Sequence, residues 1–371
     1  MRRIAPRRGP PRTPATGPPR FDVAAAEAVA EAVEFVDRVH GPVRFPLSQI
    51  GDFVILRRDG RPSYNFAVVV DDLLMEITHV IRGDDHLSNT PRQILLHRAL
   101  GASTLPEFAH LPLIAAPGGA PLSKREGPAS IARYRERGYP PEALLNALAL
   151  LGWSPPGGQE LLTPEELVAM FDLDRVSSSP ATFDQQKLDA LATRHMARLP
   201  EGRLAALAAE QLARAGLLPD PIPPVTWEWV GRLARLFSER LPNMGALVEE
   251  ASFLFDFDAG RCLAEAAVRE TLTAQPSRAV IESLVERIGE GPLTAPRFLT
   301  IAEEVRRETG AKGRELFHPI RVALTGATSG PELVRLLPVI DSARALPLPR
   351  PVASCVERAR ALLEATGGDR R

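Results

Sequence analysis

The sequence predicts an α/β region followed by all-α regions. Short apolar-rich runs fill residues 33–116, and turn-forming pairs such as Asp59-Gly60 separate them, as in strands joined by tight turns. From about residue 128 onward, apolar residues recur at helical spacing. The 371 residues suffice for about two or three domains. No run approaches the roughly 18 apolar residues that a membrane-spanning helix needs.

The first third alternates predicted strands and helices. The expected elements are a short alanine-rich helix over 22–32, hairpins over 33–46 and 52–70, strands over 77–83 and 110–116, and a helix that follows Thr90-Pro91 and ends at Gly101.

The remainder predicts helices. Thr163, with Glu166 three residues later, forms a capping-box pattern that marks a helix start. Helices are expected over 140–153, 163–171, 200–215, 228–240, 262–272, 277–289, 297–308, 331–337 and 351–366. The proline-rich patch at 219–225 predicts a linker or a sharp turn between helical groups.

Composition excludes several classes of protein. The net charge of −1 argues against a chain coated in basic residues, although it permits a local nucleic-acid surface. Cys262 and Cys355 stand far apart with no Cys/His cluster, so neither a disulfide scaffold nor a structural zinc site is expected.

The first 20 residues hold six arginines and six prolines, and they lack the apolar centre of a signal peptide. We therefore expect a disordered leader and a cytoplasmic protein.

The loop 117–127, PGGAPLSKREG, is the first candidate site. Only three of the 45 basic residues are lysines, and Lys124 lies in this loop beside Ser123 and Arg125. Glycines allow close backbone approach, and a mobile ammonium suits an anion such as a phosphate. A solvated surface turn is the alternative interpretation.

The second candidate site lies near predicted strand ends, where open α/β sheets bind ligands. Arg82 could pair with a carboxylate, Tyr64 could hydrogen-bond to it, and His86 follows closely. The aspartate pairs at 71–72 and 84–85 could bind a metal or form turns. The alternative is structural, with Tyr64 packed in a strand.

The strings YNFAVVVDD, ITHVIRGDDHLSNTPRQILL, HLPLI and LSKREG resemble the second half of the catalytic domain of bacterial-type glutamyl-tRNA synthetases, which are class I aminoacyl-tRNA synthetases. The resemblance continues through GYPPEALLNALALLGWSP and FDQQKL to HPIRVALTGATSGPELVRLLPVI at 318–340, and it spans residues 33–366. It implies an incomplete class I Rossmann-like catalytic domain followed by all-α C-terminal regions. The implied domains are a leader (1–32), the second catalytic half (33–131), a helical stem-contact region (132–197) and a helical anticodon-binding region (198–371).

The resemblance also implies the chemistry. Glutamate would attack the α-phosphorus of Mg-ATP, and a ribose hydroxyl of tRNA(Glu) would then take the glutamyl group. Lys124 matches the second lysine of the KMSKS-type motif and is the candidate catalytic residue, stabilising charge on the triphosphate. Tyr64, Arg82 and His86 match the glutamate-binding positions. The implied ATP-binding loop consists of Pro121, Leu122, Ser123, Lys124 and Arg125. ATP with Mg2+ is a substrate, and neither protein-bound zinc nor a membrane partner is expected.

The sequence departs from the family in several places. It has no HIGH-type motif, Pro121 replaces the first lysine of the KMSKS-type motif, and Ala190, Ala192 and His195 stand where the family favours Trp, Asn and Tyr. We therefore expect a truncated glutamate–tRNA ligase with low or no activity alone, for which a missing N-terminal fragment is a candidate partner. An artificial start or a frameshift would explain the leader.

Two alternatives remain open at the sequence level. The first is a non-catalytic paralogue that binds tRNA. The second is a relative that glutamylates a modified tRNA base, which is disfavoured because such relatives lack the anticodon-binding region. In either ligase or paralogue, arginines such as Arg314 and Arg321 are expected to contact tRNA.

Overall fold

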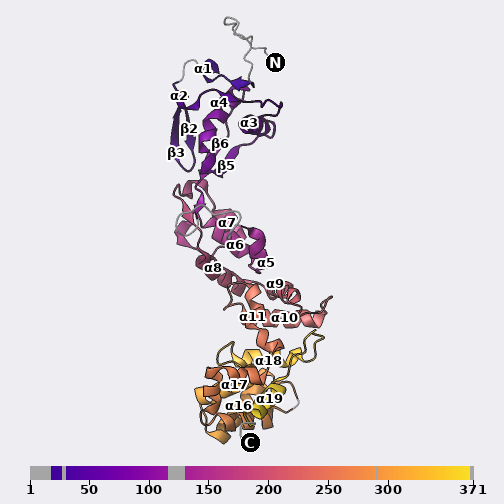
Figure 1. Ribbon diagram of the computed structural model, residues 1–371. Helices are drawn as coiled ribbons and strands as arrows, with labels where there is room; N and C mark the ends of the chain where they lie inside the picture. Colours follow the sequence, from indigo (N-terminus) through magenta and orange to yellow (C-terminus); the bar gives the residue numbers. More distant parts are fainter. Residues whose placement is uncertain (1–17, 27–30, 116–129, 290, 368–371) are drawn as a thin grey trace. The chain divides into compact units, whose positions relative to one another are not determined.

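Figure 1 shows the chain as a ribbon, and the chain forms two compact units. Each unit has its own hydrophobic core. The computed structural model describes residues 18–26, 31–115, 130–289 and 291–367. The first unit comprises residues 1–122 and 149–183, and the second comprises residues 123–148 and 184–371.

A four-stranded sheet forms the centre of the first unit, with the strand order β3-β2-β6-β5. Its strands are β2 (Ala32–Asp37), β3 (Gly41–Pro46), β5 (His79–Gly83) and β6 (Glu107–Leu111). Strands β2 and β3 form an antiparallel hairpin, whereas β2 and β5 both run parallel to β6. The carboxyl ends of three strands therefore meet at one edge, where open α/β sheets bind ligands.

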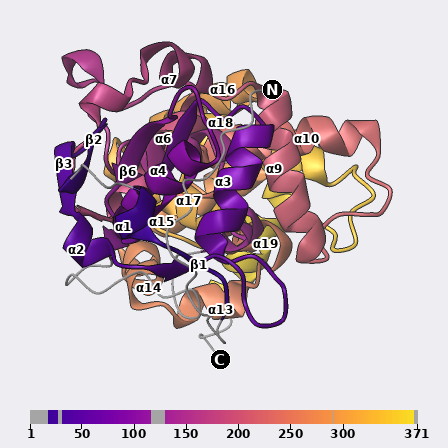
Figure 2. The same ribbon diagram turned by 90° about the horizontal axis from the view of Figure 1, so that it is seen from above.

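Helices α3 (Tyr64–Leu74) and α4 (Thr90–Ala99) pack against each other, and α4 also contacts β2 (Figures 1 and 2). Ile94 and Leu95 of α4 are buried against residues of the sheet. The core consists of Val23, Val33, Ile50, Ile94, Leu95 and Phe108. This packing holds the amino end of α4 close to the carboxyl edge of the sheet.

Smaller elements complete the first unit. The short strand pairs are β1 (Arg20–Phe21) with β4 (Phe53–Val54), and β7 (Ile114–Ala115) with β8 (Ala181–Thr182). The helices are α1 (Val23–Ala26), α2 (Leu47–Ile50), α7 (Pro164–Met170) and the 3-10 turns η1 (Asp84–Asn89), η2 (Pro156–Gly158) and η3 (Leu173–Arg175). A second small core gathers Trp153, Leu162 and Leu167.

One predicted strand is wrong. The turn at Asp59-Gly60 is present, with a bridge between Leu56 and Pro62, but the expected returning strand is helix α3. Three consecutive valines favour a strand by local propensity. Packing against α4, which buries Val69 completely, overrides that preference. Tyr64 is therefore the first residue of a helix and not a strand residue.

Other predicted elements are confirmed. The 33–46 hairpin pairs along its whole length, and the strand expected over 77–83 is present from His79 onward. The strand expected over 110–116 begins earlier, at Glu107, and is interrupted before β7. The capping box is present, since the Glu166 backbone N–H donates to the Thr163 hydroxyl at 3.2 Å and Thr163 donates back to the Glu166 carboxylate at 2.8 Å.

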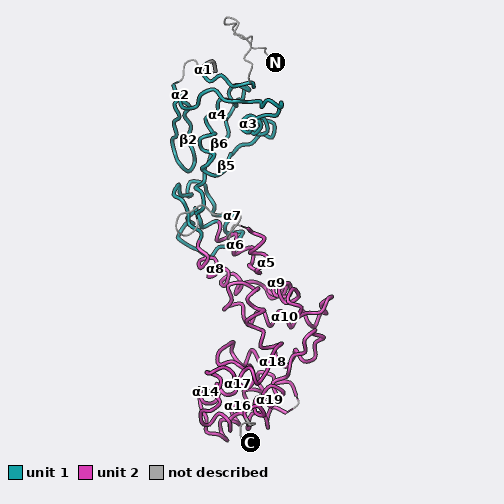
Figure 3. The backbone as a smooth tube through the Cα atoms, viewed as in Figure 1, with its two compact units in different colours: residues 1–122, 149–183 teal, residues 123–148, 184–371 magenta. Residues whose placement is uncertain are grey.

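The described part of the second unit, which is magenta in Figure 3, is helical. This confirms an α/β region followed by all-α regions. Its helices are α5 (Ile131–Glu136), α6 (Pro141–Ala149), α8 (Gln185–Arg198), α9 (Glu201–Arg214), α10 (Pro224–Phe237), η4 (Met244–Ala246), α11 (Leu247–Glu250), α12 (Ser252–Phe255), α13 (Ala259–Ala264), α14 (Ala266–Thr273), α15 (Ser277–Ile288), α16 (Ala295–Thr309), α17 (Arg314–Thr325), α18 (Leu333–Ala343) and α19 (Cys355–Gly367). Helices α9 and α10 lie side by side (Figure 2). Among the described helices, none has the length and apolar character to cross a membrane.

Candidate functional site

Three polar side chains converge at the carboxyl edge of the sheet. Asp37 is the last residue of β2, and Arg82 of β5 pairs in register with His110 of β6. His110 donates from Nδ1 to Asp37 Oδ2 at 2.6 Å. Arg82 donates from Nε to His110 Nε2 at 3.0 Å. The Asp37 and His110 side chains are 0% exposed, so these contacts are shielded from water.

Asp37 is fixed by the hairpin turn that follows it. Its Oδ1 accepts the backbone N–H groups of Val39 and His40 at 3.0 Å each, and that of His110 at 3.3 Å. Burial alone would raise the pKa of Asp37, but the hydrogen bonds from the His110 ring and from these backbone groups outweigh burial and lower the pKa. Asp37 is therefore an ionised carboxylate.

His110 is the neutral member of the group. Burial lowers its pKa, although the hydrogen bond to Asp37 opposes the shift. Because Nδ1 donates to Asp37, the neutral ring offers the lone pair of Nε2 as an acceptor for Arg82. The tautomer follows from these two hydrogen bonds.

Thr90, the first residue of α4, completes the support of Arg82. Its hydroxyl oxygen accepts from Arg82 Nη2 at 2.8 Å and lies 3.0 Å from His110 Nε2. Thr90 is 0% exposed. One whole edge of the guanidinium, Nε with Nη2, is therefore held by two buried acceptors.

Arg82 itself is half-buried. Burial lowers the pKa of its guanidinium, while the Tyr64 hydroxyl and the carboxylates of Asp72 and Asp85 raise it. Arginine retains its charge under such shifts because its ordinary pKa is so high. A cation partly withdrawn from water is suited to a carboxylate ligand.

The structure brings the three predicted ligand-binding residues together. The rings of Tyr64 and His86 lie 5.5 Å apart between centroids, and the His86 carbonyl oxygen lies 3.4 Å from Arg82 Nη2. His86 is also in hydrogen-bond contact with Asn89, at 3.1 Å between Nδ1 and Nδ2. Tyr64, on α3, is 49% exposed and so remains accessible.

Sequence reasoning missed the support of Arg82, namely Asp37, Thr90 and His110. The signal available was the position of a histidine and an aspartate near the ends of two predicted strands, but their pairing depends on the strand order.

Of the two aspartate pairs, the second contains a structural contact. Asp84 Oδ1 lies 2.9 Å from His40 Nε2. In the described ranges, no group of three or more His, Cys, Asp or Glu residues could hold a metal ion.

The predicted ATP-binding loop lies outside the described residues. This applies to Pro121, Leu122, Ser123, Lys124 and Arg125 alike.

Helix α17 of the second unit carries a row of basic side chains at positions 314, 318 and 321. Arg314 Nε lies 3.4 Å from His318 Nδ1, and Arg321 Nη1 donates to the Pro331 carbonyl at 2.8 Å. Burial and then the two arginines lower the pKa of His318. A cavity of about 400 Å3 includes Arg314 and His318 in its lining. Positive charge on one helix face is suited to phosphate groups.

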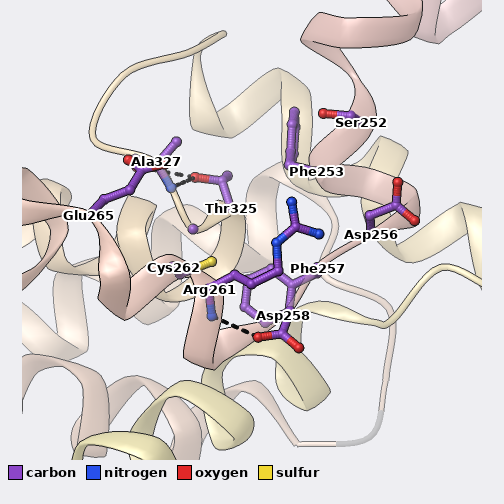
Figure 4. Close-up of a pocket in the computed structure, with 11 residues that line it drawn as sticks. Ser252, Phe253, Asp256, Phe257, Asp258, Arg261, Cys262, Glu265, Thr325 and Ala327 are labelled. Carbon is purple, nitrogen blue, oxygen red and sulfur yellow. Dashed lines mark hydrogen bonds between the residues drawn. The ribbon is translucent and has the colours of Figure 1, made fainter.

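A second cavity in this unit, of about 270 Å3, lies between α12, α13 and the end of α17 (Figure 4). Two of its three acidic side chains have partners within the protein. Asp258 accepts the Arg261 backbone N–H at 2.7 Å, and Asp256 pairs with Arg350 at 3.1 Å. None of the ligand-binding or catalytic residues predicted from the sequence is among those that line this cavity.

Comparison with known families agrees with this arrangement. Residues 23–190 match the catalytic domain of class I tRNA synthetases (E and Q), and residues 203–346 match an anticodon binding domain. The glutamate–tRNA ligase of Heliobacterium modesticaldum is 42% identical over 307 residues, covering 82% of this chain and 61% of the relative. That of Bacillus subtilis is 40% identical over 336 residues, covering 88% of this chain and 67% of the relative.

A solved structure is also similar. The crystal structure of a glutamate tRNA ligase from Elizabethkingia meningosepticum, in complex with its amino acid, superposes with a TM-score of 0.73 at 25% identity. The match covers 90% of this chain and 66% of that one. The chain thus spans between three fifths and two thirds of the length of these relatives. From its two matched domains and these similarities, we conclude that the chain belongs to the glutamate–tRNA ligase family of class I aminoacyl-tRNA synthetases.

Proposed function

We propose that the chain binds L-glutamate, ATP and tRNA(Glu) as a glutamate–tRNA ligase. An oxygen of the glutamate α-carboxylate would attack the α-phosphorus of Mg-ATP, and pyrophosphate would leave. A ribose hydroxyl at the end of the tRNA would then attack the glutamyl carbonyl, and AMP would leave. The observation that carries the proposal is the partly buried Arg82 guanidinium, held at the carboxyl edge of the sheet with Tyr64 beside it.

In this proposal Arg82 receives the side-chain carboxylate of glutamate. A guanidinium forms an ion pair with a carboxylate, whereas an amide offers it only a neutral acceptor. Binding of glutamine would leave a partly desolvated cation without its counter-charge. The site should therefore discriminate between the two amino acids by charge, with Tyr64 and His86 contributing contacts at its rim.

We further propose that Lys124 and its loop bind the triphosphate, and that the row on α17 contributes to tRNA binding. Support for the second role is the proximity of Arg314, His318 and Arg321 within a region that matches an anticodon binding domain. The absence of a HIGH-type motif from the sequence leads us to expect slow or undetectable charging by this chain alone.

Titration calorimetry with the purified 371-residue chain tests the glutamate site. Arg82→Ala should weaken L-glutamate binding by roughly 10- to 100-fold, the loss expected for hydrogen bonds to a charged group. Arg44→Ala is the matched control, since Arg44 is exposed and pairs with Glu34 across the hairpin. Equal affinities for glutamate and glutamine would count against the proposal.

Binding measurements with tRNA, glutamate and glutamine separate the ligase from the non-catalytic alternative. A chain that binds tRNA but shows no affinity for glutamate would support a tRNA-binding paralogue. Binding of glutamate with discrimination against glutamine supports the ligase, whatever the rate of charging.

A further inference from the structure

The hydrogen-bonded pair of Asp37 and His110 has no role in the function proposed so far. We propose that His110, oriented by Asp37, is a positioning residue that acts with Thr90 to orient Arg82 for a carboxylate ligand. The inference rests on the glutamate-binding role proposed for Arg82.

The first argument concerns which edge of the Arg82 guanidinium binds to the protein. Nε and Nη2 of Arg82 donate to His110 Nε2 and Thr90 Oγ1 at 3.0 and 2.8 Å. Guanidinium offers its N–H groups in a fixed planar fork. Holding one edge therefore fixes the plane and direction of the other, so that the Nη1 end meets the carboxylate. Less side-chain entropy is then lost on binding.

The second argument concerns charge. A direct ion pair between Asp37 and Arg82 would occupy the guanidinium and compete with a carboxylate ligand. Instead the neutral His110 ring lies between them, donating to Asp37 at 2.6 Å and accepting from Arg82. Arg82 is thereby oriented by neutral acceptors and keeps its positive charge for the ligand.

The third argument is the tautomer of His110. An isolated neutral imidazole can carry its proton on either nitrogen. The Asp37 carboxylate holds the proton on Nδ1 and so leaves Nε2 as an acceptor. The backbone N–H groups of Val39 and His40 hold Asp37 in place, which makes the hairpin turn part of the same support.

Two substitutions of His110 separate positioning from packing. In His110→Gln, the amide oxygen can replace Nε2 as the acceptor for Arg82, but the contact with Asp37 is lost. In His110→Asn, the amide nitrogen can replace Nδ1 as the donor to Asp37, but Arg82 loses its acceptor. A role in packing alone predicts that glutamate affinity follows the stability of each variant.

Substitutions of Thr90 and Asp37 provide an independent pair of tests. Thr90→Val keeps the shape of the side chain but removes the acceptor for Nη2, and Thr90→Ser restores a hydroxyl. Asp37→Asn can donate a proton to Nδ1, which would place the imidazole proton on Nε2, facing the Arg82 N–H. We expect Asp37→Asn to release Arg82 while the ring stays buried.

The experiment uses the full 371-residue chain and two readouts. Calorimetry gives the affinity for L-glutamate. Nitrogen-15 NMR gives the hydrogen-exchange rate of the Arg82 Nε–H, whose signal is assigned by its disappearance in Arg82→Lys. We expect His110→Asn, Thr90→Val and Asp37→Asn to bind glutamate about tenfold more weakly and to exchange this proton faster, with His110→Gln and Thr90→Ser within about twofold of the parent chain.

Several outcomes would overturn the inference. One is an Arg82 Nε–H that exchanges in the parent chain as fast as that of an exposed arginine. Another is a His110→Gln variant that loses as much glutamate affinity as His110→Asn. If a His110 variant fails to fold, the Thr90→Val and Thr90→Ser pair decides the question. If the parent chain binds no glutamate, the proposed function fails, while the exchange rates of the variants still show whether His110 and Thr90 orient Arg82.

Discussion

The guanidinium carbon of Arg358 lies 4.8 Å from the centre of the Phe257 ring, and the Arg358 side chain is completely buried. Its nitrogens donate to the backbone carbonyls of Phe253, Leu254, Leu324 and Ala353 at 2.8, 2.7, 3.4 and 2.8 Å. Burial lowers the pKa of Arg358 to about 10, so it is still protonated at neutral pH. One side chain thus joins carbonyls from three separate segments of the second unit.

Arg358→Met should destabilise the second unit by roughly 3 kcal/mol or more, because buried carbonyls would lose their donors. Arg358→Lys keeps the charge but cannot reach the same set of carbonyls, and it should also destabilise the chain. Urea unfolding followed by circular dichroism measures both changes. A lysine variant as stable as the parent chain would show that charge alone, and not the fork of N–H groups, matters.

A close backbone contact in the same unit predicts a second stability change. Gly245 donates to the Arg137 carbonyl at 2.9 Å, and a Cβ at Gly245 would lie 2.6 Å from that oxygen. Gly245→Ala should therefore cost about 1 to 3 kcal/mol of unfolding free energy. Gly202→Ala is the control, since Gly202 is exposed in α9 with no atom near its would-be Cβ, and it should be neutral or stabilising by up to about 1 kcal/mol.

Stability should fall on acidification in two stages. Burial lowers the pKa values of His97, His110 and His195, so the unfolded chain binds protons first as the pH drops below about 6.5. The pKa of Asp37 is also lowered, so its ionised carboxylate stabilises the folded chain above about pH 4. This stabilisation is lost as the pH falls through the pKa that Asp37 has in the folded chain. Unfolding free energies measured between pH 7.5 and 5 test the first stage. His110→Gln should lose less stability over that range than the parent chain.

The basic row on α17 should contribute to the salt dependence of tRNA binding. Arg314→Ala together with Arg321→Ala should weaken tRNA binding and reduce the slope of log K against log salt by up to about two. Arg278→Ala is the control, because Arg278 is exposed and pairs with Glu282 on α15. An unchanged slope in the double variant would place the phosphate contacts elsewhere.

Lys124 should matter for ATP and not for tRNA. Lys124→Ala should weaken ATP binding about tenfold, as expected for the loss of a charge-assisted contact with a phosphate. Its tRNA affinity should equal that of the parent chain. Lys312→Ala, which changes one of the two other lysines, is the control for the loss of a single charge. Equal losses of ATP and tRNA affinity in Lys124→Ala would contradict the assigned role.

Local features of the fold were predictable from sequence, and non-local ones were not. The β2–β3 hairpin and the capping box at Thr163 depend on neighbours within a few residues, and both are present. The strand expected at Tyr64 failed because contacts with α4, formed by residues further along the chain, override the preference of consecutive valines. The predicted domain limits at residues 131 and 197 stay predictions.

The candidate site shows the same contrast between local features, which the sequence predicts, and non-local ones, which it does not. Tyr64, Arg82 and His86 were predicted by motif and come together in the structure. His110 and Asp37 were missed because they meet Arg82 only through the order of the strands, in which β6 lies between β2 and β5. No local pattern specifies that order.

The division of the chain into interleaved units has a consequence for its synthesis. Strand β7 pairs with β8, which begins at Ala181, so the first unit lacks part of its structure until that residue has left the ribosome. Residues 123–148, synthesised earlier, belong to the second unit and must wait for residues 184 onward. The first unit can therefore complete its fold once residue 183 has left the ribosome, whereas helices α5 and α6 lack the rest of their unit until residues 184 onward have been made.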